Sequence, residues 1–212
     1  MILKNLSLTE NLTVDFIDVF LRKLYPDNIF FRNKTIKDKK FGVFKPNFIC
    51  DELKIIVEFR DAKHYMKSRI QLKDSITTVY FKELNYKIIE IPYFVQLTKE
   101  VIKILFDINL QGNLYKCSEH GFINGNMILP ADFNSIGVNK FIDDSERFGD
   151  IIQTAIMDSL SKLTNERNEQ YTVLPDLFYS NDIIDNFEIS NDVDLDDTEK
   201  EIIEKNLTDM TV

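Results

Sequence analysis

Apolar residues recur every three or four positions in three segments of the first half of the chain, and this period predicts helices. One such segment ends near Tyr25, and Thr9 or Thr13 is suited to cap its start. The other two segments cover residues 65–84 and 97–107. The spacing therefore predicts three helices in this part of the chain.

Short and largely apolar runs lie between the predicted helices and indicate strands. The run from 53 to 60 follows Asp51 and Glu52, which we interpret as a hairpin turn, and a second run covers 87–92. Because a helix connects these two runs, we expect them to lie parallel with a right-handed crossover. Further short strands are expected at 29–32, 41–44 and 47–50. The pattern predicts an α/β fold with a mixed sheet flanked by helices.

The character of the sequence changes after residue 110. We expect residues 1–110 to form the main domain and residues 111–180 to form a small α+β subdomain packed on it. Within that subdomain the pattern predicts a hairpin over 113–130 and a helix over 143–163. Residues 181–212 are mostly acidic, a composition typical of a flexible tail.

Charge is distributed unevenly along the chain, whose formal net charge is −9. Residues 1–110 hold 19 Lys and Arg against 14 Asp and Glu, a net charge of +5. Residues 111–180 hold 5 against 10, and residues 181–212 hold 2 against 11, so these two parts contribute −5 and −9. The mildly basic first part is compatible with nucleic-acid binding, and the acidic tail is a candidate contact for a partner protein.

The overall composition indicates a packed globular protein, with 44% hydrophobic residues and 17 Phe. No apolar run approaches the ~18 residues of a membrane span, and the N-terminus lacks a signal-peptide pattern. Two cysteines favour a reducing compartment over a disulfide scaffold. We therefore expect a cytoplasmic protein without membrane contact. The richness in Lys, Ile, Asn and Phe suggests a bacterial or phage source, in the bacterial cytoplasm or an infected host cell.

Charged side chains occupy the end of the predicted 53–60 strand. Alternation along the strand places Glu58 and Arg60 on the same face, and Asn47 lies across from them in the preceding hairpin strand. Because burying an unpaired charge is costly, we expect this end of the strand to meet solvent, a metal ion or a partner. Carboxylates on adjacent strands are a simple way to hold the divalent cation that assists phosphodiester hydrolysis.

Several short motifs follow one another in a definite order in this region. They are KPNF at 45–48, EFR at 58–60, His64, Asp74 in the following helix and NYKIIEIP at 85–92. In this order the chain resembles the PD-(D/E)XK nuclease superfamily, and within it the small proteins similar to very-short-patch repair endonucleases. The likeness covers roughly residues 10–95. It implies a restriction-endonuclease-like fold, a DNA substrate, Mg²⁺ or Mn²⁺ as cofactor, and catalytic positions at Asn47, Glu58, Arg60 and His64.

Two departures from the family pattern affect its chemistry. Asn47 stands where the family has an aspartate, and a neutral amide is a weaker ligand for a hard cation. Arg60 stands where the family has an acidic residue or a lysine, and it does not lose its proton at physiological pH. A rebuilt metal site would need Glu58 together with Asp61, Asp74 and a first-helix acid, Asp18 or Asp15. The alternative, which we favour, is that the metal site is lost and that Glu58 and Arg60 form a structural ion pair.

Basic residues lie on both sides of this constellation. The loop 34–40, with Phe31 and Phe41 beside it, is suited to contact phosphates and to stack on bases. The residues expected at nucleic acid are Lys34, Lys37, Lys39, Lys40, Lys63, Lys67 and Arg69. An ordinary solvated loop is the alternative, as is a local helix-start hydrogen bond for His64. A zinc site built from Cys50, His64, Cys117 and His120 is not favoured, because the last two form only half a motif.

The sequence predicts a DNA-binding protein on a nuclease-like fold whose endonuclease activity is weakened or lost. One alternative is an active metal-dependent endonuclease that uses a rearranged site. Another is a protein-interaction subunit, viral in origin, that docks through the acidic segment 181–212. Within that segment, residues 198–201 form a capping box before a short amphipathic stretch.

Overall fold

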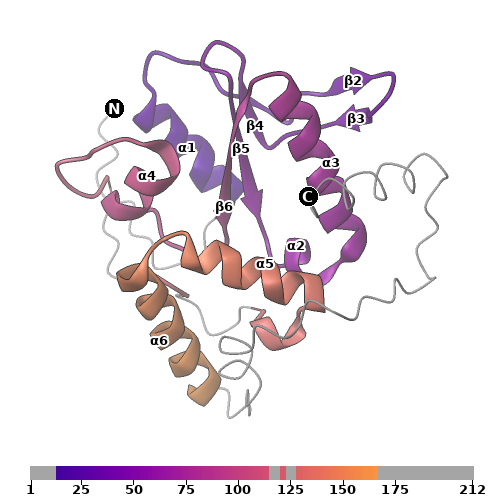
Figure 1. The fold of residues 1–212 in the computed structure, drawn as a ribbon. Coiled ribbons are helices and arrows are strands. Elements are labelled where there is room, and N and C mark those ends of the chain that lie inside the picture. The colour runs from indigo at the N-terminus through magenta and orange to yellow at the C-terminus, as the bar shows by residue number, and fades with distance from the viewer. Residues whose placement is uncertain (1–12, 115–119, 123–127, 167–212) are drawn as a thin grey trace.

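The computed structural model of this chain describes residues 13–114, 120–122 and 128–166 (Figure 1). Its helices are α1 (Val14–Leu24), α2 (Lys63–Met66), α3 (Ser68–Glu83), α4 (Lys99–Phe106), α5 (Ser135–Glu146) and α6 (Asp150–Glu166), with a 3₁₀ turn at Pro130–Asp132. Its strands are β1 (Phe31–Arg32), β2 (Ile36–Asp38), β3 (Gly42–Phe44), β4 (Phe48–Cys50), β5 (Ile55–Arg60) and β6 (Lys87–Pro92).

A four-stranded mixed sheet with the order β1-β4-β5-β6 forms the centre of the molecule. β4 and β5 form an antiparallel hairpin, and β6 lies parallel to β5 after a crossover through α2 and α3. The register of this parallel pair sets Glu58 opposite Glu90. The predicted mixed sheet with flanking helices is therefore confirmed.

Helices cover both faces of the sheet. Alternate residues of β5 point to opposite sides, and apolar side chains on both sides are buried. Val57 belongs to the core that includes α1 and α4, whereas Ile56 packs into a second core with Tyr80 of α3. Figure 1 shows α3 on one side of the strands and α1 and α4 on the other. Since Glu58 and Arg60 share the face of Ile56, both charged side chains point toward α3.

Side-chain caps define where several helices begin. The hydroxyl of Thr13 accepts a hydrogen bond from the backbone N–H of Phe16 at 3.2 Å, so Thr13, one of the two predicted caps, caps α1. Thr9, the other predicted cap, lies outside the described residues. Thr98 caps α4 in the same way through the N–H of Val101.

The prediction of one helix over 143–163 is wrong, because two helices, α5 and α6, cover this part of the chain. α5 begins earlier, at Ser135, because the side chain of Asn134 caps it through the N–H of Gly137 at 2.7 Å. Gly149, at φ +77°, lies between α5 and α6 and allows the chain to turn there.

Two further predictions about secondary structure are corrected. The helix predicted over 65–84 begins earlier and breaks at Lys67, whose extended backbone separates α2 from α3. The predicted basic loop 34–40 is part of a two-stranded ribbon formed by β2 and β3. Among the described helices, none has the length and apolar character needed to cross a lipid bilayer.

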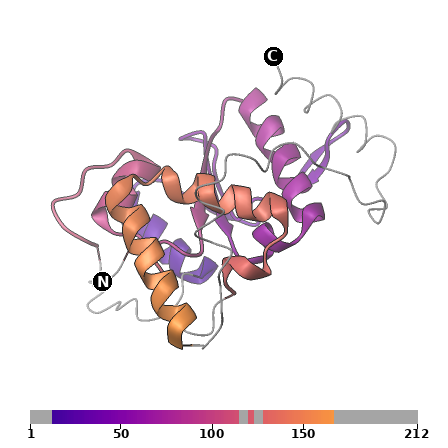
Figure 2. The ribbon, with the colours of Figure 1, turned by 60° about the horizontal axis from the view of Figure 1, so that its bottom comes forward.

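α5 and α6 pack on the chain that follows β6, and their apolar residues join the core shared with the sheet (Figure 2). The ring centroids of Phe94 and Phe141 lie 4.7 Å apart. α5 approaches α2 so closely that a Cβ added to Gly137 would lie 1.6 Å from the carbonyl oxygen of Tyr65. The hairpin predicted over 113–130 lies largely outside the described residues, and the acidic segment 181–212 lies wholly outside them.

Candidate functional site

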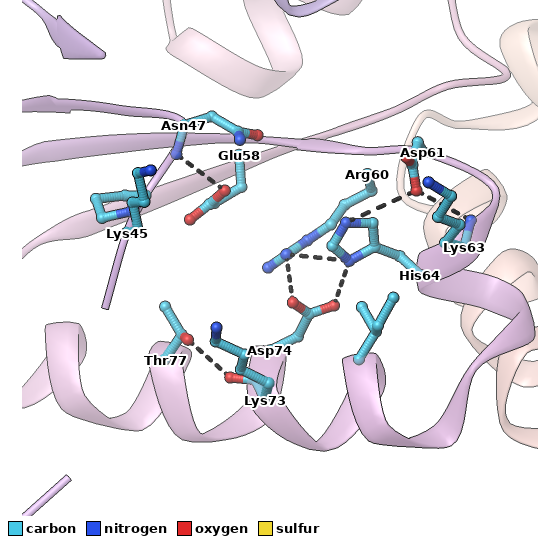
Figure 3. Close-up of a pocket in the computed structure, with 12 residues that line it drawn as sticks. Lys45, Asn47, Glu58, Arg60, Asp61, Lys63, His64, Lys73, Asp74 and Thr77 are labelled. Atoms are coloured by element: carbon cyan, nitrogen blue, oxygen red, sulfur yellow. Dashed lines mark hydrogen bonds and ion pairs between the residues drawn. The ribbon is translucent and has the colours of Figure 1, made fainter. Parts of the chain in front are cut away.

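A pocket of about 280 Å³ opens where the end of β5 faces α3 (Figure 3). The linker between β3 and β4 forms one wall, and α2 closes the far end. Its lining residues are Lys45, Pro46, Asn47, Glu58, Arg60, Asp61, Lys63, His64, Ile70, Lys73, Asp74 and Thr77. The structure thus brings together all four predicted catalytic positions and the helix aspartate.

Glu58 is a nearly buried carboxylate in this pocket, with 8% of its surface exposed. One of its oxygens, Oε2, accepts a hydrogen bond from the backbone N–H of Asn47 at 3.3 Å. Burial raises the pKa of Glu58, although the charge of Arg60 and the hydrogen bond from Asn47 oppose this effect.

Asn47 lies beside Glu58, as the hairpin register predicted. Its side-chain Oδ1 accepts a hydrogen bond from the backbone N–H of Phe59 at 2.7 Å. This bond ties the amide to the neighbouring strand. Because the amide is neutral and its oxygen already has a donor, Asn47 is a poor replacement for the aspartate that a metal site would use.

Arg60 is held in place by carboxylates on two other elements. Its guanidinium donates to Asp74 of α3 at 2.6 Å and to Glu90 of β6 at 2.5 Å, and only 2% of its surface is exposed. Burial lowers the pKa of Arg60, but the charges of Glu90, Asp74 and Glu58 outweigh it and raise the pKa. The ion pair predicted between Glu58 and Arg60 is therefore replaced by pairs with Asp74 and Glu90.

His64 also contacts Asp74, the aspartate of α3 that pairs with Arg60. Its Nδ1 lies 2.7 Å from Oδ2 of Asp74 and 3.4 Å from a guanidinium nitrogen of Arg60. Its Nε2 lies 3.9 Å from a carboxylate oxygen of Asp61, which also accepts a hydrogen bond from the N–H of Lys63. Figure 3 shows Arg60, His64 and Asp74 pointing toward one another. Asp74 therefore orients the side chains of both Arg60 and His64.

The charge network continues from the pocket to α5, and this continuation was missed by sequence reasoning. Glu90 accepts a hydrogen bond from Lys140 at 3.1 Å, and Lys140 lies 3.4 Å from Asp144. The buried hydroxyl of Tyr65 donates to Asp144 at 2.7 Å. Burial raises the pKa of Glu90, but the charges of Arg60 and Lys140 outweigh it and lower the pKa to about 2. The charge of Glu90 in the middle of a mostly apolar strand was the sequence signal available for this network.

Lys45, Lys63 and Lys73 bring three ammonium groups to the pocket from three different segments. All three residues are exposed, and none of them forms an ion pair with any residue that the structure describes. They are therefore the charges of the pocket that remain available to an anionic ligand. Lys45 was not among the predicted binding residues.

The other predicted nucleic-acid contacts lie outside the pocket. Lys34 forms an ion pair with Asp51 at 2.5 Å, so its charge is already matched. Lys67 and Arg69 are exposed at the start of α3. Lys37, Lys39 and Lys40 belong to the β2–β3 ribbon.

Asp18, predicted as a metal ligand, does not reach the pocket. It lies on α1, which packs on the face of the sheet opposite to α3, and it pairs with Arg22 at 3.2 Å. Cys50 is buried in that same apolar core, and His120 contacts the hydroxyl of Thr98 at 3.2 Å. The structure therefore brings neither of these two residues to His64, and Cys117 lies outside the described residues.

The donor set of the pocket does not fit a divalent cation. Glu58 keeps one oxygen without a hydrogen-bond donor, whereas Asp74 is engaged by Arg60 and His64. Within the described ranges, no three His, Cys, Asp or Glu side chains are grouped so as to hold a metal ion. A hard cation prefers several oxygen ligands. Asp61, also predicted as a metal ligand, lines the pocket, but one of its oxygens already contacts the N–H of Lys63 and the ring of His64.

Comparison of this chain with known protein families, with curated proteins and with solved structures gives no match. The functional argument therefore depends on the geometry of the pocket and on the surrounding surface charge.

Proposed function

We propose that this chain is a DNA-binding protein on a nuclease-like fold in which metal-dependent cleavage is weakened or lost. The order of elements supports the fold assignment: Asn47 precedes one hairpin strand, Glu58 lies near the end of the next, Asp74 follows on the crossover helix, and β6 completes the parallel pair. This is the order in which the family resemblance places its motifs. A fold of this kind presents the end of the hairpin to a nucleic-acid backbone.

The position of Arg60 is the observation that carries the argument for lost cleavage. A cationic side chain that assists phosphodiester hydrolysis has to reach the phosphate, and Arg60 is buried between Asp74 and Glu90. Moving Arg60 away would break both of these buried ion pairs, which costs on the order of 3–5 kcal/mol. Together with the amide at Asn47, this leaves the pocket without the donor set of a metal-dependent nuclease.

Three lysines that form no ion pair with the described residues support binding. Lys45, Lys63 and Lys73 border the pocket, and Lys67 and Arg69 extend the basic surface along the start of α3. Contacts of this kind to backbone phosphates release counterions, so they give affinity that falls steeply with salt. The pocket therefore suits a phosphate group of the DNA backbone.

The experiment compares DNA binding by the wild type with binding by the triple variant Lys45→Ala, Lys63→Ala, Lys73→Ala. Fluorescence anisotropy of a labelled DNA is recorded at several salt concentrations. The logarithmic salt slope should fall by up to about 2.7 in the variant, since each lost phosphate contact removes about 0.9. The matched control replaces Lys82, Lys87 and Lys103, which are exposed away from the pocket, and should keep most of the slope. Equal losses in both variants, or no DNA binding by the wild type, would overturn the proposal.

A further inference from the structure

The β2–β3 ribbon is a separate two-stranded sheet that extends past α3, away from the central sheet (Figure 1). Its register pairs Ile36 with Phe44 and Lys37 with Val43. Because side chains alternate along a strand, these two pairs lie on opposite faces of the ribbon.

The inner face anchors the ribbon to α3. The ring of Phe44 stacks on Tyr80 with centroids 4.3 Å apart, and the ring of Phe41 lies 5.5 Å from the same tyrosine. Ile36 packs against this aromatic cluster. The ribbon is therefore fixed to the body of the molecule and does not depend on a ligand for its position.

The tip of the ribbon is held in shape by its own turn. The carboxylate of Asp38 accepts hydrogen bonds from the backbone N–H groups of Lys40 at 2.7 Å and Phe41 at 2.9 Å. Gly42 follows at φ +90°, a conformation that glycine adopts without strain. The turn therefore presents the Lys39 and Lys40 side chains from an ordered backbone.

The outer face and the tip of the ribbon are basic and exposed. Residues 31–45 contain six Lys or Arg and one Asp. Lys37 and Lys39 form no ion pair within the part of the chain that the structure describes, and Lys40 lies over the ring of Phe41 at 4.6 Å. Val43, opposite Lys37, is 55% exposed and gives this face an apolar patch between the charges.

The aromatic residues of the ribbon are not free to stack on bases. Phe44 is buried, and Phe41 is half-buried against Tyr80. Phe31 is 50% exposed but lies on β1, where the ammonium of Lys34 sits 5.3 Å from its ring. Proteins that hold single strands use exposed aromatic platforms, which the ribbon does not offer.

We propose that the β2–β3 ribbon is a DNA-contacting arm that enters the major groove of a duplex. The major groove admits a two-stranded β-ribbon, and lysines at its tip and outer face reach the phosphates on either side. Lys45, which follows β3 directly, links the arm to the pocket. This inference rests on the proposed function and names its substrate as double-stranded DNA.

The experiment uses the full chain with Lys37→Ala, Lys39→Ala and Lys40→Ala combined. Affinities are measured for a guanine-containing duplex and for the single strand of the same sequence. Duplex affinity at low salt should fall by about tenfold or more, with a salt slope reduced by up to about 2.7, and single-strand affinity should change much less. The control variant with Lys82, Lys87 and Lys103 replaced should bind both as the wild type does.

A second readout tests the groove itself. Bound wild-type protein should protect guanine N7, which faces the major groove, from methylation by dimethyl sulfate, and the tip variant should lose this protection. Equal losses of affinity for duplex and single strand, or unprotected guanine N7 beneath bound wild type, would overturn the proposal that the ribbon enters the major groove. The proposal that the protein binds DNA would still stand. Absence of any binding by the wild type would overturn the proposed function and the arm together. Circular dichroism and the melting temperature establish that the tip variant is folded.

Discussion

At the scale of single residues, Asn47 places a neutral amide beside the nearly buried carboxylate of Glu58. The amide keeps the hydrogen bond to the N–H of Phe59 that a carboxylate in its place would also make. It does so without adding a negative charge beside Glu58. The wild-type pocket thus holds Glu58 without the repulsion of a second carboxylate at this position, and it lacks the pair of carboxylates that attracts a hard cation.

Asn47→Asp should make the protein less stable and responsive to metal. Two adjacent carboxylates repel each other, so in EDTA we expect a loss of on the order of 1–3 kcal/mol in the free energy of unfolding. Mn²⁺ should recover part of that loss and raise the melting temperature of the variant more than that of the wild type. The exposed control Asn109→Asp should show no such metal response. An equal response to Mn²⁺ in wild type and Asn47→Asp would show that the amide does not limit metal binding.

Glu90→Gln should destabilise the fold because it removes the charge shared by Arg60 and Lys140. Breaking a buried network of this kind costs about 3 kcal/mol at neutral pH. In the folded state the pKa of Glu90 is lowered to about 2. The carboxylate therefore contributes fully to the free energy of unfolding above the pKa that it has in the unfolded chain. This contribution declines as the pH falls from there toward about 2. Urea unfolding across this pH range should therefore show wild type and variant converging in acid.

The matched control for this measurement is Glu83→Gln, an exposed glutamate at the end of α3. It should change the free energy of unfolding little at any pH. Equal effects of the two substitutions would mean that the carboxylate of Glu90 contributes nothing beyond an exposed charge.

At the scale of elements, the apolar runs predicted the central strands well because burial on two faces leaves a strong sequence pattern. β6 has the predicted bounds, and the hairpin of β4 and β5 lies where Asp51 and Glu52 indicated. β3 lies within the strand predicted at 41–44, whereas β2 was missed because it has only three residues and its charges resemble those of a loop. The division between α5 and α6, which falls at Gly149, was missed because apolar residues continue on both sides of it.

Gly137→Ala should disrupt the contact between α5 and α2. The added methyl group would overlap the carbonyl oxygen of Tyr65, so α5 has to move away, at a cost on the order of 1–3 kcal/mol or more. The displacement should also shift the NMR signals of the His64 ring, since Lys140 on α5 reaches the pocket through Glu90. Gly112→Ala, where a Cβ meets nothing within 4 Å, serves as the control. A melting temperature unchanged in both variants would contradict the close packing of α5.

At the scale of the whole molecule, the order of motifs in the sequence predicted which residues share the pocket. The packing of the fold determined which ion pairs they form. Asn47 and Glu58 were expected near each other because hairpin register and strand alternation constrain them, and His64 was expected there because of the family resemblance. The engagement of Arg60 by Glu90 and the approach of Lys140 were not predicted, since they depend on how β6 and α5 pack. A first-helix ligand was expected and not found, because α1 covers the other face of the sheet.

The basic groups in and around the pocket accordingly divide into two kinds. Arg60 and Lys140 are neutralised inside the network that ties α5 to the sheet. Lys45, Lys63 and Lys73 remain on the pocket rim without a partner among the described residues. This division predicts a surface that attracts DNA around a pocket whose interior is committed to holding the fold.

The most direct test is to incubate purified wild-type protein with supercoiled plasmid in Mg²⁺ or Mn²⁺ and to measure binding and nicking in the same samples. The proposed function predicts salt-dependent binding of the plasmid, with nicking no greater than that of the Glu58→Ala variant. Metal-dependent nicking by the wild type that Glu58→Ala abolishes would contradict it, because Glu58 would then be a working metal ligand despite Asn47 and the buried Arg60.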